Sequence, residues 1–190
     1  MGSHTRTMRS KQKILDATLG LIAEAGFEDV TIAAVARAAG VTRQTVYSIF
    51  TTREDMMSEA MVGLVVDVIG GIREKADRAE TPAEFVVETI VAARNLVHRE
   101  PVLNSLLRSC NANPLFAPDV MDRAEPVVRQ FLDGYVERNP GFDSRQFDGI
   151  EAILVRTGLS VILFVDPRIH DDDGLRDYLR RWLVPVLPFG

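Results

Sequence analysis

The chain has 190 residues, 46% of them hydrophobic, and one cysteine, so we expect one or two globular domains in the cytoplasm and exclude an internal disulfide. Its formal net charge of −5 is unevenly distributed: residues 1–53 carry seven Lys and Arg against four Asp and Glu, whereas the remainder carries fifteen against twenty-three. A basic first quarter on an acidic body indicates that the first part contacts a polyanion, and no apolar run is long enough to span a membrane.

Hydrophobic residues recur at helical spacing along the whole chain, and we therefore expect an all-α protein. Ser10 is the predicted cap of a first helix that ends at Gly26. Thr31 is the predicted cap of a short second helix that ends at Gly40, where the turn favours a positive φ angle. Thr42 is the predicted cap of a third short helix, whose apolar residues are expected to point inward.

A long fourth helix is predicted over residues 52–79, although three glycines weaken its helical propensity. Residues 81–84 (Thr-Pro-Ala-Glu) form a capping box with proline at the first helical position, so another helix starts there and ends before Pro101. Further helices are expected over residues 102–111, 118–138, 145–165 and 174–184.

The second helix, a turn over residues 40–42 and the third helix have the spacing of a helix-turn-helix. In this motif the latter helix enters the major groove of DNA, where the fork of Arg43 suits guanine and the amide of Gln44 suits adenine. The alternative is a solvated polar face on an ordinary helical hairpin, and the basic charge of the segment favours DNA. The candidate DNA-contacting residues are Thr31, Thr42, Arg43, Gln44, Thr45, Tyr47, Ser48 and Arg53.

The stretch over residues 13–57 resembles the DNA-binding domain of TetR-family (tetracycline-repressor-like) transcriptional regulators. The resemblance rests on ILDA at 14–17, EAGF at 24–27, VTI at 30–32, AGVTR at 39–43 and TVY at 45–47. It implies that residues 42–48 form the recognition helix and that Thr31, Tyr47 and Arg53 contact phosphate groups. Gln44 and Ile49 depart from the commonest family pattern; Gln44 adds a candidate base reader, and Ile49 removes a phosphate contact.

The resemblance also implies how the chain is divided. Residues 1–52 would form the DNA-binding domain, with residues 1–9 as an arm, and residues 53–190 would form a helical-bundle domain for ligand binding and dimerisation. The expected function is that of a homodimeric repressor that a small, mainly apolar ligand releases from a palindromic double-stranded DNA operator. A dimeric DNA-binding protein without an effector is the alternative, which an enclosed apolar cavity would disfavour.

Within the second domain, we expect dimerisation through the helices near 118–138 and 145–165, where small residues permit close approach of helices. Burial in the core of a single chain is the alternative for each of these residues. The candidate interface residues are Tyr135, Gly149, Ala152, Ile153, Gly158 and Val161.

A ligand cavity is expected because helices in this domain carry apolar residues on more faces than one packed layer requires. Arg156 could anchor an anionic ligand, but an ion pair with Glu88 or Asp133, or one across the dimer, is the simpler interpretation of an arginine in an apolar run. The candidate cavity residues are Val65, Ile90, Leu103, Leu107, Cys110, Phe116, Met121, Phe131 and Arg156.

An enzyme that uses Cys110 as nucleophile and His98 as base is a remote alternative. No glycine-rich phosphate loop, nucleophile elbow or metal-spaced carboxylate pattern accompanies these two residues. We therefore expect no catalysis, no cofactor, no metal site and no membrane partner.

Overall fold

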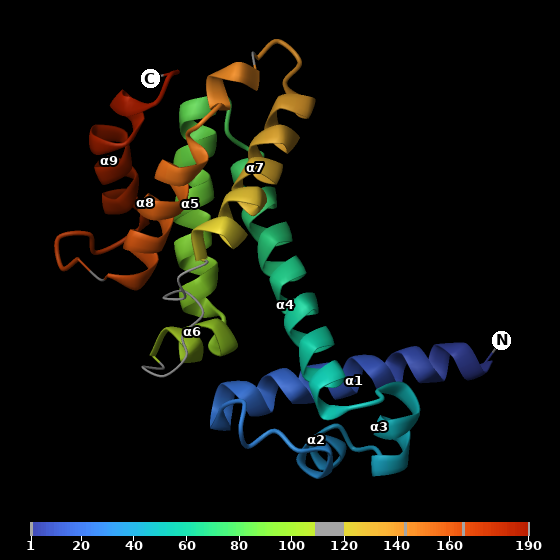
Figure 1. The fold of residues 1–190 in the computed structure, drawn as a ribbon. Helices are drawn as coiled ribbons and strands as arrows, with labels where there is room; N and C mark the ends of the chain where they lie inside the picture. Colours follow the sequence, from blue (N-terminus) through green and yellow to red (C-terminus); the bar gives the residue numbers. More distant parts are fainter. Residues whose placement is uncertain (1, 109–119, 143, 165, 190) are drawn as a thin grey trace. The chain divides into compact units, whose positions relative to one another are not determined.

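The computed structural model describes residues 2–108, 120–142, 144–164 and 166–189, and within these ranges all regular elements are helical (Figure 1). The chain divides into two compact units: Met1–Asp67 with Pro101–Leu106, and Val68–Glu100 with Leu107–Gly190. No helix in the described part of the chain is long and apolar enough to cross a membrane.

The first unit is built from α1 (Gly2–Ala25), α2 (Ile32–Ala38), α3 (Arg43–Ile49), the first half of α4 (Arg53–Ala76) and most of α6 (Pro101–Arg108). Helices α1, α2 and α3 all contact one another, as Figure 1 shows. Their apolar faces meet because each helix repeats its hydrophobic residues every three or four positions. The buried core of this unit includes Ile14, Ile22, Val30, Val35, Val46, Phe50, Met56 and Ala60.

The predicted caps of α2 and α3 are confirmed, since the Thr31 and Thr42 hydroxyls accept hydrogen bonds from the amides three residues later, each at 3.1 Å. Gly26 and Gly40 have φ angles of 84° and 66°, as their positions after helices favour. The start of α1 was predicted wrongly: the helix begins at Gly2. Ser10 lies inside it, because no proline upstream stops the helix from extending.

The second unit contains the rest of α4 with α5 (Pro82–Arg99), α7 (Val120–Arg138), α8 (Glu151–Leu163) and α9 (Asp172–Trp182). Helix α5 contacts both α8 and α9, and α7 packs on α8 (Figure 1). Helix α6 (Pro101–Arg108) follows α5, and short 3-10 turns cover Ser144–Phe147 and Val184–Val186. Helix α7 contains an internal proline, Pro126.

The division between the units falls inside α4, whereas the sequence placed it at residue 53. Met56 and Ala60 of the first half of α4 are fully buried in the first unit, at 0% and 2% exposure. Ile72 and Ala76 of its second half belong to the core of the second unit. One helix thus supplies core residues to both units.

A cluster of aromatic rings forms part of the core of the second unit. Tyr135 lies 4.5 Å from Phe85 between ring centroids, and Phe142 and Phe147 pack on its other sides. Burial raises the pKa of the Tyr135 hydroxyl. Among the described residues, the core cluster of this unit contains Ile72, Ala76, Phe85, Val86, Val87, Ile90, Val91, Ala92, Phe131, Leu132, Tyr135, Phe147, Ile150, Leu154, Leu175, Leu179, Leu183 and Leu187.

An ion pair joins α5 to α9. Arg176 donates two hydrogen bonds to the carboxylate of Glu88, from Nε at 2.6 Å and from Nη2 at 3.0 Å. These hydrogen bonds raise the pKa of the Arg176 guanidinium. The predicted pairing of Glu88 with Arg156 is therefore wrong: Arg156 is exposed and donates to the carbonyl of Ala152 at 3.2 Å.

Candidate nucleic-acid interface and ligand cavity

Hydrogen bonds and an apolar contact within the helix-turn-helix fix its geometry. The amide of Val41 donates to the carbonyl of Ala36 at 2.9 Å, and the amide of Gly40 donates to the carbonyl of Arg37 at 3.3 Å. Val35 and Val46 are both fully buried, so the two helices share an apolar contact. The turn and this contact hold α3 in one orientation on α2.

The outward face of α3 is polar and exposed, and it begins with Arg43 and Gln44. Tyr47 follows one turn later with 60% of its surface exposed. The side chains of these three residues have no hydrogen bond within the described part of the chain, which leaves their donors available. Arg43 and Gln44 lie at the start of the helix, the end that contacts base edges in this motif, and Tyr47 lies one turn further on.

The other hydroxyl groups of α3 are used inside the helix. Thr42 and Thr45 share a hydrogen bond of 2.9 Å between their hydroxyl oxygens, and Ser48 donates to the carbonyl of Thr45 at 2.8 Å. These bonds satisfy the helix start and reduce the capacity of the three residues to donate to DNA. Thr31 likewise caps α2 and remains exposed.

A surface hollow next to α3 contains a basic residue that sequence reasoning did not single out. It is lined by α2 with its cap Thr31, by the turn and by the first residue of α3, and its basic residues are Arg37 and Arg43. Arg37 is exposed in the last turn of α2. The sequence offers little indication of a binding role for Arg37, because a single arginine in an alanine-rich helix is equally typical of a solvent-exposed surface.

Arg53, predicted to contact phosphate, has a structural role in the first unit. Its Nε donates to the carbonyl of Val30, its Nη2 donates to the carbonyl of Phe27, and its Nη1 pairs with Glu54 at 3.2 Å. The carbonyls of the loop between α1 and α2 have no helical partner, so they need such donors. Arg53 therefore fastens the start of α4 to this loop, and we withdraw it as a phosphate contact.

Replacing Arg53 with alanine should destabilise the first unit by about 2–3 kcal/mol, because two backbone acceptors lose a charged donor. Thermal unfolding measures the change, with Arg37→Ala as the matched control, since Arg37 is an exposed arginine in the same unit. An Arg53→Ala protein that unfolds at the wild-type temperature but binds DNA weakly would restore the phosphate role.

Residues 14–60 match the model of the family described as bacterial regulatory proteins, tetR family. The match contains α2, the turn and α3, whose geometry is that of a helix-turn-helix. The DNA-binding domain of the chain is of the TetR family. The resemblance of the sequence to TetR-family regulators is thus confirmed, and this fold supports a DNA-binding transcriptional regulator.

The similarity to TetR-family structures extends over the second unit. The TetR-family repressor AlkX from Dietzia sp. strain DQ12-45-1b is 25% identical, with coverage of 93% of this chain and 94% of that chain and a TM-score of 0.60. A TetR-like regulator from Rhodococcus sp. RHA1 is 17% identical, with coverage of 90% and 91% and a TM-score of 0.57. The fatty acid degradation regulator FadR from Bacillus halodurans is 18% identical, with coverage of 95% and 97% and a TM-score of 0.54. No protein of curated function matches the sequence significantly.

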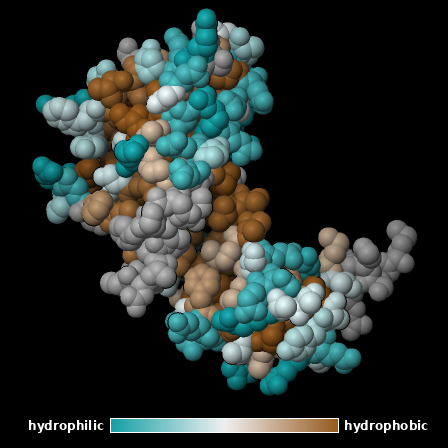
Figure 2. Space-filling view, in the orientation of Figure 1, coloured by the Kyte–Doolittle hydropathy of each residue, from teal (hydrophilic) through white to brown (hydrophobic). Residues whose placement is uncertain are grey.

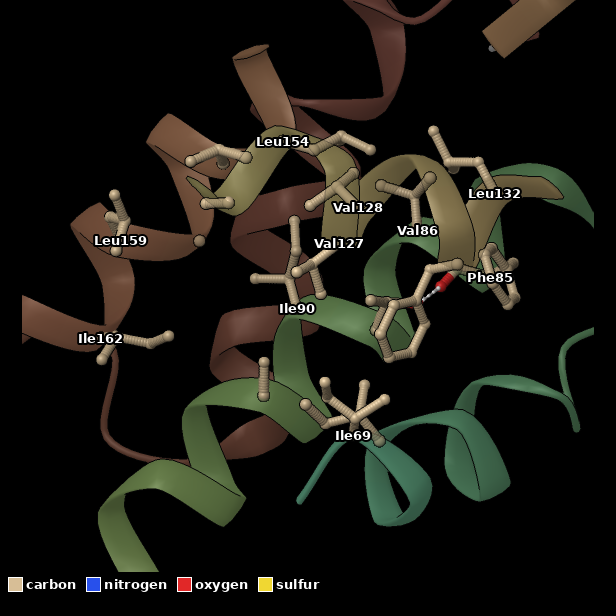
Figure 3. A pocket seen from close by; sticks show the side chains of 17 residues that line it. Ile69, Phe85, Val86, Ile90, Val127, Val128, Leu132, Leu154, Leu159 and Ile162 are labelled. Carbon is tan, nitrogen blue, oxygen red and sulfur yellow. Dashed lines mark hydrogen bonds between the residues drawn. The ribbon is translucent and has the colours of Figure 1, made fainter. Parts of the chain in front are cut away.

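The second unit contains a cavity of about 290 Å³ that is partly open to solvent, since its lining residue Val127 is 39% exposed. Its wall comes from α4, α5, α7 and α8, and the labelled side chains in Figure 3 converge on the space around Ile90 and Val127. The lining residues are Ile69, Ile72, Phe85, Val86, Thr89, Ile90, Ala93, Ala124, Val127, Val128, Phe131, Leu132, Leu154, Val155, Gly158, Leu159 and Ile162.

Two of the predicted cavity residues, Ile90 and Phe131, line this cavity. Five others lie elsewhere in the described chain and do not line it: Val65, Leu103, Leu107, Met121 and Arg156. The prediction failed for these residues because helical periodicity does not show which apolar face of a helix borders a cavity. Cys110 and Phe116 lie outside the described residues, so the proposed Cys110–His98 pair is not described either. No group of three potential metal ligands occurs among the described residues.

The predicted interface residues fall into three different environments. Tyr135 is 3% exposed and lies in the core, so it is not available to a partner chain and we remove it from the interface. Gly149 precedes α8 with a φ angle of 80°, which explains the glycine as a turn residue, and the helix predicted over 145–165 begins only at Glu151. Gly158 lines the cavity, whereas Ile153 is 38% exposed. The remaining two candidates, Ala152 and Val161, are half-buried on α8.

Proposed function

We propose that the protein is a homodimeric repressor that binds a palindromic operator and is released from it by a mainly apolar small molecule. The observation that carries this proposal is the cavity: its wall includes Ile69 and Ile72 of α4, and the first residue of the same helix, Arg53, bonds to the loop before α2. A molecule that displaces α4 at the cavity therefore acts on the same helix whose first residue is bonded to the loop before α2. A dimeric regulator without an effector would have no use for such a cavity.

The names of two structural neighbours support an apolar effector. AlkX is described as a repressor implicated in biodegradation of n-alkanes, and FadR as a regulator of fatty acid degradation. Both descriptions concern molecules with long hydrocarbon parts, and the cavity of this chain has the matching apolar wall.

Dimerisation is proposed through α8 and α9 rather than through α7 and α8. Trp182 and Tyr178, one turn apart on α9, are 61% and 42% exposed, and Phe164 after α8 is 67% exposed. Figure 2 shows that the second unit has both hydrophobic (brown) and hydrophilic (teal) residues at its surface. Large apolar side chains in this number on one surface are typical of an interface, and a two-fold axis would pair the surface with itself.

The recognition helix can be tested by separating sequence preference from overall affinity. An operator is first selected from a pool of random duplexes with the wild-type protein. Arg43→Ala and Gln44→Ala should each lose about 1–3 kcal/mol at one base pair and bind scrambled duplex almost unchanged. Tyr47→Ala should weaken binding to both duplexes alike, because a phosphate contact does not depend on sequence.

Tyr47→Phe is the matched control, since it keeps the ring and removes only the hydroxyl that would bind phosphate. Fluorescence anisotropy titrations at one fixed salt concentration measure all variants, because the electrostatic part of the affinity changes with salt. If selectivity between operator and scrambled duplex is unchanged in both the Arg43 and the Gln44 variants, α3 is not the element that reads bases.

A further inference from the structure

The wall of the cavity in the second unit has a uniform chemistry that restricts the occupant. All lining side chains are aliphatic or aromatic except Thr89, and Gly158 contributes only backbone. We propose that the cavity binds an uncharged hydrocarbon molecule of about twelve heavy atoms that places no ionised head group inside it. The proposal rests on the proposed function only in treating this occupant as the effector; the binding itself can be tested without DNA.

Thr89 does not provide a polar anchor. Its hydroxyl donates to the carbonyl of Phe85 at 2.7 Å, within the same helix. The hydroxyl hydrogen is therefore already used, and Thr89 presents mainly its methyl group and an acceptor oxygen to the cavity. A hydroxyl or carboxyl group of a ligand would find less hydrogen bonding here than in water.

A cation, Arg73, lies behind one of the aromatic rings of the wall. The guanidinium carbon of Arg73 is 5.5 Å from the ring centroid of Phe131, which lines the cavity, but Arg73 itself is not a lining residue. Its Nε is buried with no hydrogen-bond partner. An anionic ligand could use this donor only if the ring of Phe131 moved aside, so Arg73 defines the competing hypothesis: a fatty-acid-like anion.

The volume sets the size of the occupant. A cavity of about 150 Å³ lined by Leu, Ile and Phe binds benzene, with its six carbons. A cavity of about 290 Å³ therefore suits roughly twice as many heavy atoms, or about twelve. The lining residues of α5 run from Phe85 to Ala93, a distance of about 12 Å along the helix axis. A bicyclic aromatic molecule or a medium-length alkane meets both limits.

The test compares matched pairs of probes with and without a carboxylate: naphthalene with 2-naphthoate, and n-octane with octanoate. Naphthalene and naphthoate are titrated by fluorescence, and octane and octanoate by calorimetry, on the full-length protein at pH 8. We expect each hydrocarbon to bind at one molecule per chain and each carboxylate at least 100-fold more weakly. A carboxyl group with the usual pKa near 4 must enter protonated, so its affinity should rise about tenfold for each pH unit lowered.

Two filling variants locate the binding site. Gly158→Leu and Ala93→Leu should each lower hydrocarbon affinity at least tenfold, because both positions line the cavity and no atom lies within 4 Å of a Cβ built at Gly158. Gly70→Leu is the matched control: Gly70 is an exposed helical glycine with equal space around it and lies outside the cavity.

Three results would overturn the proposal. The first is that neither hydrocarbon binds, and the second is that binding survives in both filling variants. The third is a carboxylate that binds as tightly as its hydrocarbon at pH 8, independently of pH, and is lost in Arg73→Met; this result assigns the cavity to an anion. Hydrocarbon binding that leaves operator affinity unchanged would contradict the proposed release mechanism and leave the ligand class intact.

Discussion

Replacing Trp182 with glutamate should convert the proposed homodimer into monomers at micromolar concentration. Trp182 is 61% exposed at the C-terminal end of α9, whereas Leu175 and Leu179, earlier on nearly the same side of the helix, are fully buried. The apolar side of α9 is therefore buried in the core along the helix and exposed at its last turn. Loss of a central tryptophan from an interface costs about 2–4 kcal/mol, and a two-fold interface contains the residue twice.

Sedimentation velocity on Trp182→Glu and wild-type protein measures this effect. The expected loss, about 4 kcal/mol or more for the two copies, raises the dissociation constant of the dimer about 1,000-fold. Trp182→Phe, which keeps an aromatic ring, should remain largely dimeric. Val62→Glu is the second control, because Val62 is equally exposed, at 60%, on α4 in the first unit. A Trp182→Glu protein that stays dimeric would place the interface elsewhere.

Replacing Gly158 with leucine should abolish the proposed response of DNA binding to ligand. The new side chain occupies the cavity, and leucine has the better helix propensity, by up to about 1 kcal/mol, so α8 should fold normally. DNA binding requires none of the cavity residues and should be retained. This outcome differs from that of a substitution at a dimer contact, the role that sequence reasoning assigned to Gly158.

The measurement is operator affinity with and without saturating naphthalene. Couplings between two binding sites are commonly 5- to 150-fold. We expect the wild-type protein to lose affinity within this range and the Gly158→Leu protein to lose less than twofold. Gly70→Leu should respond like the wild type. Because coupling is reciprocal, operator DNA must weaken naphthalene binding to the wild-type protein by the same factor; a mismatch between the two factors would exclude a simple linked equilibrium.

The local sequence predicted the start of a helix well where a single capping residue determines it. Thr31, Thr42 and Thr81 are caps in the structure, because a threonine hydroxyl needs only the amide three residues later, which the local sequence supplies. Ser10 failed as a cap because a possible cap does not prevent a helix from extending upstream. The helix-turn-helix was predictable for the same reason: its turn and its outward face are contiguous in the chain.

The roles of residues with distant partners were not predictable in this way. Arg53 bonds to carbonyls 23 and 26 residues earlier, and an arginine just after a recognition helix is equally compatible with phosphate binding. Glu88 pairs with Arg176, 88 residues away, although Arg156 is also a nearby cation in the helical pattern. Tyr135 and Gly158 lie on apolar faces, but periodicity does not show whether core, cavity or partner covers a face.

Pro126 in α7 has a consequence for how fast the cavity can exchange its contents. Because proline has no backbone N–H, the bond that residue 126 would make to the carbonyl of Asp122 is missing. Ala124, Val127 and Val128, which flank this point, all belong to the cavity wall. The first turns of α7 can therefore detach at a smaller cost than the rest of the helix. Residence times of a bound molecule should thus follow local fraying of α7 and stay far shorter than the lifetime of the folded protein.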